Sequence, residues 1–311
     1  MNAEELNDFL GQKIIEAIKD EDMSKDRKLS RVEYLYKRGA NLKVRDRKNW
    51  TTLMWASREG HKDVAEFLIE KGVEINAFSI EGSTALSVAS YSGHKEVVEL
   101  LIEKGADLEA KNRDGVTALL YACSCGHKDV VELLIKHKAN IKANNIYGSN
   151  VLMEACTSGS KEIAELLIEK GIDVNDEDII GETALMNASK EGFFDVVKFL
   201  IEKGSVVDKK NDGGNTALMY AAGCGHKEIL ELLIEKGADV SALNNSGNSA
   251  LVLASRNRHK DVVELLKTKQ EDKRSKIKEE LKEDANVLSK KEESSINGGF
   301  FRRLFGGNDG M

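Results

Sequence analysis

The feature of this 311-residue sequence that most constrains its fold is a short string that recurs at a fixed spacing. The string Gly-x-Thr-Ala-Leu, or a close variant, begins at Gly82, Gly115, Gly148, Gly181, Gly214 and Gly247, and a degenerate copy begins at Asn49. Every copy starts 33 residues after the one before it, without an insertion or deletion. Such a period predicts one structural unit that is repeated and stacked along the chain.

Each unit is predicted to form two short helices. Thr84 is suited to cap the start of the first helix, and Gly93 to end it with the positive φ that glycine allows. The second helix is expected from about Lys95 to Lys104, and Gly105 ends it. Helices this short are not stable alone in water, so each must bury its apolar face against its neighbours. The sequence therefore predicts a solenoid with one continuous core.

The unit closely resembles the ankyrin repeat, in a pattern G-x-T-A-L-x-x-A-x-x-x-G-H-K-x-V-x-x-L-L-I-E-K-G-A that runs from about Leu10 to Lys267. This resemblance implies an all-α solenoid of about eight helix-turn-helix repeats with finger loops. One departure is consistent: the family's T-P-L-H becomes T-A-L-M, as at Thr183-Ala184-Leu185-Met186, in a chain without proline. Because alanine is the best helix former, we expect the fold to be unchanged.

Three segments are predicted. Residues 1–45 read as an N-terminal capping repeat, with a first helix from about Leu10 to Asp20 and an extended charged loop from Glu21 to Arg31. Residues 46–267 read as seven further repeats. Residues 268–311 read as a charged, largely flexible tail that ends in Gly-Gly-Phe-Phe-Arg-Arg-Leu-Phe-Gly-Gly. Lys269 to Glu293 is expected to be a solvated, partly frayed helix, or alternatively to make a coiled-coil contact through a thin apolar stripe.

The residue types that carry chemistry follow the repeat and do not converge. His61, His94, His127, His226 and His259 occupy one position per repeat, which predicts a loop-bracing hydrogen bond and excludes a shared metal site. Cys123 and Cys156 share a position at which other repeats place serine or alanine, so packing is expected there. Cys125 and Cys224 share another position that is expected to be more exposed, where a regulatory thiol is the alternative. The motifs of nucleotide-binding and hydrolytic enzymes do not occur in the sequence. We therefore expect a protein that is not an enzyme and that needs no cofactor or metal.

The net charge of −7 argues against nucleic acid as a partner. The sequence has no apolar stretch long enough to span a membrane, and its N-terminus lacks the pattern of a signal peptide. A cytoplasmic location is therefore expected, and we expect a monomer.

In the ankyrin family, partners bind the concave surface formed by the fingers and the first helices, which the resemblance implies here. Large apolar side chains at such positions are candidate anchors for a partner protein. They are Trp50, Trp55, Phe78, Ile80, Tyr91, Tyr121, Ile146, Tyr147, Ile179, Ile180, Tyr220 and Leu243. Trp55, Tyr121 and Tyr220 share one repeat position, so an alternative for these three is packing between first helices.

The C-terminal segment has three interpretations. Phe300, Phe301, Arg302, Arg303, Leu304 and Phe305 form a motif that docks on another protein, an interfacial membrane foot, or a segment that folds back on the solenoid. The sequence thus predicts a non-enzymatic scaffold or adaptor that binds a partner protein on its concave face. The alternative is a membrane-associated regulator or host-directed effector that the C-terminal segment localises. We expect membrane contact only through this segment.

Overall fold

The structure is a computed structural model that describes the backbone of residues 2–305 and the side chains of residues 2–282. Within this part of the chain there are sixteen helices and no strand. Isolated antiparallel bridges, such as the one between Asn144 and Asn150, occur only within the loops. The all-α prediction is confirmed.

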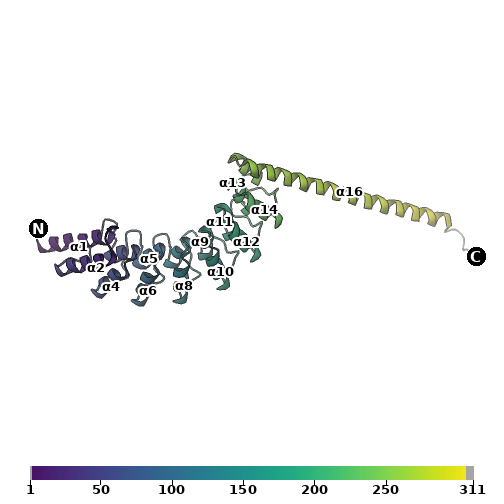
Figure 1. The fold of residues 1–311 in the computed structure, drawn as a ribbon. Coiled ribbons are helices and arrows are strands. Elements are labelled where there is room, and N and C mark those ends of the chain that lie inside the picture. The colour runs from purple at the N-terminus through teal and green to yellow at the C-terminus, as the bar shows by residue number, and fades with distance from the viewer. Residues whose placement is uncertain (1, 306–311) are drawn as a thin grey trace, which may run out of the picture.

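The helices stack as eight pairs, and the stack bends so that the odd-numbered helices lie on the inside of the curve (Figure 1). The inner helices are α1 (Ala3–Lys19), α3 (Thr52–Arg58), α5 (Ala85–Ser92), α7 (Ala118–Ser124), α9 (Val151–Thr157), α11 (Ala184–Glu191), α13 (Ala217–Cys224) and α15 (Ala250–Arg256). The outer helices are α2 (Lys25–Lys37), α4 (Lys62–Glu70), α6 (Lys95–Glu103), α8 (Lys128–Lys136), α10 (Lys161–Glu169), α12 (Phe194–Glu202), α14 (Lys227–Glu235) and α16 (Lys260–Phe305).

Local sequence sets the ends of each helix. The Thr84 hydroxyl accepts a hydrogen bond from the backbone N–H of Ser87 at 3.2 Å, which satisfies a donor at the start of α5. Gly93 then ends α5 with φ at 77°, a left-handed conformation that favours glycine. Both roles were predicted from the sequence.

The core lies between the inner and outer layers and repeats with the same period. A leucine that is almost wholly buried occupies one position in all eight outer helices. This column comprises Leu35, Leu68, Leu101, Leu134, Leu167, Leu200, Leu233 and Leu266. All eight leucines belong to one cluster of buried residues, so the hydrophobic core is continuous from α1 to α16.

The histidines at the turn between the two helices join neighbouring repeats. The Nε2 atoms of His94, His127, His226 and His259 lie 2.8–3.0 Å from backbone carbonyl oxygens of the preceding repeat. His94, for example, bonds the carbonyl of Arg58. The predicted loop-bracing role is confirmed for these four residues.

The first repeat differs from the predicted one. Its helices are longer, and the connection between them comprises only residues 20–24, because residues 25–31 form the first part of α2. The predicted loop from Glu21 to Arg31 is therefore wrong. The reason lies in Lys28, which is buried and whose Nζ donates to the carbonyl of Ile18 and contacts His61 Nε2, both at 3.0 Å. Lys28 occupies the histidine position of this repeat, 33 residues before His61.

The burial of His61 beside Lys28 makes stability depend on pH. Burial, followed by the charge of Lys28, lowers the pKa of His61 below its ordinary value of about 6.5. As pH falls through 6.5, His61 is protonated in the unfolded chain but stays neutral in the folded chain. The free energy of unfolding therefore decreases with pH until the lower pKa of the folded chain is reached. We expect His61→Gln to lose this decrease, measured by urea unfolding from pH 8 to pH 5. An unchanged slope in the variant would contradict the assignment.

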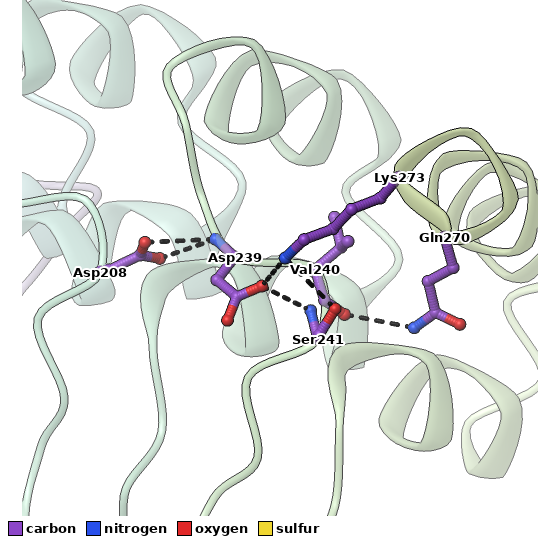
Figure 2. A network of polar contacts seen from close by, with 6 residues as sticks. All are labelled: Asp208, Asp239, Val240, Ser241, Gln270 and Lys273. Atoms are coloured by element: carbon purple, nitrogen blue, oxygen red, sulfur yellow. Dashed lines mark hydrogen bonds and ion pairs between the residues drawn. The ribbon is translucent and has the colours of Figure 1, made fainter. Parts of the chain in front are cut away.

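The last outer helix continues without a break beyond the expected boundary at residue 267. Earlier outer helices end before a left-handed residue, as at Gly237, but the corresponding residue here is Gln270, which stays helical. The Gln270 side chain donates to the carbonyl of Val240 at 3.2 Å, and Lys273 Nζ pairs with Asp239 at 2.7 Å (Figure 2). The ion pair lowers the pKa of Asp239. Helix α16 is thus anchored on the last finger before it projects from the stack (Figure 1). The helix predicted from Lys269 to Glu293 is confirmed, but it continues the outer helix of the last repeat.

Candidate protein-binding face

The inner side of the solenoid carries seven fingers, each of which connects an outer helix to the next inner helix. We number them 1 to 7 from the N-terminus, as residues 40–51, 73–84, 106–117, 139–150, 172–183, 205–216 and 238–249. In each finger a side-chain oxygen accepts from the backbone N–H four residues later, at 2.8–3.0 Å. The acceptors are Asp46, Ser79, Asn112, Asn145, Asp178, Asn211 and Asn244. Such turns fix the shape of the finger with short polar side chains.

The fingertips are joined to one another by a row of backbone hydrogen bonds. Ile146 N–H donates to the carbonyl of Asp114 at 2.9 Å, and Ile179 N–H to that of Tyr147 at 3.1 Å. Equivalent bonds, each between residues 32 apart, link all seven tips in order. The tips therefore form a preformed edge of the face rather than seven independent loops.

Eight of the predicted anchor residues are exposed on the fingers or inner helices: Phe78, Ile80, Tyr91, Ile146, Tyr147, Ile179, Ile180 and Leu243. The row of backbone hydrogen bonds between the fingertips, which we call the tip row, places four of them together on fingers 4 and 5. We call Ile146, Tyr147, Ile179 and Ile180 the fingertip patch; their side chains are 49–64% exposed. Exposed apolar side chains that adjoin are typical of interaction sites.

Trp55, Tyr121 and Tyr220 brace the fingers. Trp55 is buried and its Nε1 lies 3.2 Å from Asp46, while the Tyr121 and Tyr220 hydroxyls accept from Asn112 and Asn211. The Tyr220 hydroxyl also donates to Glu182. Burial raises the pKa of both tyrosines. These contacts are with fingers. Only the Tyr121 ring, which meets Tyr91 of the neighbouring inner helix edge to face, shows the predicted packing between first helices. Tyr121 and Tyr220 remain partly open to the inner face.

Trp50, at the base of finger 1, is half-buried against Trp55, with ring centroids 4.7 Å apart. Sequence reasoning missed the basic residues around this pair. Arg58 lies over both rings and Lys19 over Trp55, at 4.2–5.7 Å from the ring centroids. Neither residue lies in finger 1. The charge of that finger, four basic residues and one acidic residue, was the available signal that this end of the face is basic.

Charge changes sign along the fingers. Finger 1 carries Lys43, Arg45, Arg47 and Lys48 against Asp46. Finger 5 carries five acidic residues and no basic one: Asp173, Asp176, Glu177, Asp178 and Glu182. The face therefore offers a basic, aromatic end and an acidic, apolar region to a partner.

Phe300, Phe301, Arg302, Arg303, Leu304 and Phe305 form the last turns of α16, and their side chains lie outside the described ones. The three interpretations of this segment stay predictions. Among the described residues no group of three or more histidine, cysteine or acidic side chains is arranged to hold a metal ion. None of the helices in the described part of the chain is long and apolar enough to cross a membrane.

Comparison with known proteins agrees with this architecture. A family model for ankyrin repeats in three copies matches residues 22–112, 107–178 and 185–277. The crystal structure of the human ASB11 ankyrin repeat domain matches with a TM-score of 0.64 at 28% sequence identity, over 70% of this chain and 98% of that domain. Comparison with curated proteins gave no match. Because the family model covers most of its length, the chain belongs to the ankyrin repeat family.

Proposed function

We propose that this protein is a non-enzymatic scaffold or adaptor that captures one partner protein on the inner face of its solenoid. Ankyrin repeats are in general protein interaction modules. The observation that supports this role most directly is the fingertip patch, in which four exposed apolar side chains sit on tips held by backbone hydrogen bonds. A preformed surface loses little conformational entropy on binding.

The test replaces all four residues of the patch by serine (Ile146, Tyr147, Ile179 and Ile180). The side chains protrude into solvent, so we expect the melting curve to change little while capture of the partner from native lysate is lost, as read by mass spectrometry. Surface substitutions of this kind usually change stability by less than about 0.5 kcal/mol each.

The matched control makes four serine substitutions at exposed apolar residues of the outer helices: Tyr34, Phe194, Ile277 and Leu281. It should capture the partner as the native chain does. Equal loss in both variants, or no loss in either, would contradict the role of the patch. A chain ending at Lys282 keeps the contacts of Gln270 and Lys273; a partner lost only with this truncation would assign binding to the C-terminal segment instead.

A further inference from the structure

Two hollows adjoin on the inner face at the N-terminal end of the solenoid. The first, of about 250 Å³, is lined by Trp50, Arg58, Ser83, Ser87, Val88, Tyr91 and Tyr121. The second, of about 490 Å³, is lined by Lys19, Asp46, Arg47, Lys48, Trp50, Trp55 and Arg58. Because Trp50 and Arg58 line both, we treat the two as one aromatic-basic groove.

Aromatic rings form the walls of the groove. The Trp50 and Trp55 rings stack at a tilt of 43°, and Tyr91 meets Tyr121 edge to face with centroids 5.6 Å apart. The smaller hollow is below the range of about 300–1,000 Å³ that is usual for drug-sized ligands. It therefore suits a single apolar or aromatic side chain, with Tyr91 more than half exposed at its edge.

The rim of the groove is positive. Among the described residues, the side chains of Lys19, Arg47 and Lys48 form no ion pair, and Arg58 has only a long one, of 3.8 Å to Glu59. Asp46 is the one acid that lines the groove, and both of its oxygens accept hydrogen bonds from finger 1 and Trp55. The groove thus has four cationic side chains and one carboxylate that is already hydrogen-bonded, although the net charge of the chain is −7.

From this arrangement, we propose that the aromatic-basic groove binds a short acidic peptide segment of a partner, with one aromatic or aliphatic side chain inserted between Trp50 and Tyr91. Carboxylates on either side of that anchor would pair with Lys19, Arg47, Lys48 and Arg58. The proposal rests on the protein-binding function above and gives it a partner chemistry.

Charge along the rest of the face favours a peptide over a nucleic acid. A polyphosphate chain that followed the fingers beyond the groove would meet the five acidic residues of finger 5. A short acidic segment fills the groove without reaching them. The basic region is also smaller than the extended basic stripe that nucleic-acid binding requires.

Trp50 and Trp55 are the only two tryptophans of the chain, so intrinsic tryptophan fluorescence reports on the groove alone. The full-length protein is titrated with a blocked heptapeptide that has one phenylalanine between two runs of three glutamates. We expect a saturable change in emission whose affinity falls as salt rises. A peptide with alanine at the centre and one with lysines in place of the glutamates should both bind at least about tenfold more weakly.

The variant Arg47→Glu/Lys48→Glu should weaken the phenylalanine peptide by about tenfold or more. Its control, Lys62→Glu/Lys95→Glu, makes the same change in net charge at the exposed starts of α4 and α6 and should bind as the native chain does. All variants keep both tryptophans, and far-UV circular dichroism verifies that they fold.

Several results would overturn the proposal. One is that the phenylalanine peptide causes no saturable change in emission, and another is that the control variant loses as much affinity for the peptide. A third is that a single-stranded oligonucleotide binds more tightly than the peptide. A fourth is that emission changes with protein concentration alone, which would assign the groove to a second copy of the chain. The fingertip variant should bind the peptide normally. Loss of lysate capture in that variant, without any peptide binding to the native chain, would leave the proposed function intact and remove only the groove.

Discussion

Replacing Ser57, Ser90 and Ser189 together by alanine should make the protein more stable. These residues occupy one position of the inner helices and are wholly buried, and in the described part of the chain their hydroxyl oxygens have no hydrogen-bond partner. A buried, unsatisfied polar group costs about 1–3 kcal/mol, and alanine removes it with a small change in volume. The native chain already places Ala222 at this position.

Ser189 lies at least three repeats from Ser57 and Ser90. We therefore expect the gain from Ser189→Ala to add almost fully to the gains from the other two substitutions. Urea unfolding of the single and triple variants measures them as a rise in the free energy of unfolding. The control is Ser158→Ala. The Ser158 hydroxyl lies 2.9 Å from the carbonyl oxygens of Cys123 and Ala155, so its removal should lower stability by about 0.5–1.5 kcal/mol. A triple variant that is no more stable than the native chain would show that these hydroxyls find partners.

The same position explains two of the cysteines. Cys123 and Cys156 are wholly buried there, and burial strongly raises the pKa of both thiols, which makes them poor nucleophiles. The sequence favoured packing for this position because other repeats place serine or alanine there. Cys224 belongs to another position and is exposed.

The sequence predicted the repeated part of the fold closely because one residue type recurs wherever one physical role recurs. Threonine caps such as Thr84, left-handed glycines such as Gly93 and the histidine braces could all be assigned by spacing alone. The prediction was wrong where a repeat changes the residue at one of these positions. Lys28 fills the histidine position, and Gln270 stands where the earlier outer helices are followed by a left-handed residue, which is usually glycine.

The candidate site was less accessible to sequence reasoning, for a different reason. The tip row consists of backbone hydrogen bonds between residues 32 apart, and no side-chain pattern encodes them. Lys19 reaches Trp55 from the preceding inner helix, 36 residues earlier, and that helix lies outside the regular period. Individual anchors such as Ile146 and Ile179 could be listed from the sequence, but their assembly into a patch and a groove required the structure.

The tip row leads to the second large effect, which we expect from Gly148→Ala. Gly148 has φ at +79°, and an added Cβ would lie 2.7 Å from the backbone nitrogen of Ile179. Alanine in this conformation costs about 1–2 kcal/mol. The contact should add about 1–3 kcal/mol, because backbone on the next finger must move and the bond from Ile179 to Tyr147 is strained or lost.

Gly247→Ala separates the two contributions. Gly247 has φ at +73° at the same position of finger 7, yet an added Cβ would meet nothing within 4 Å. This variant should lose only the conformational part, so urea unfolding should show the larger loss for Gly148→Ala. The same substitution should weaken partner capture through the fingertip patch, since it acts between Tyr147 and Ile179. Equal losses of stability in the two variants would mean that the neighbouring fingertip moves aside without a cost in free energy. Fingertips that move so easily would not supply the preformed surface on which the proposed binding depends.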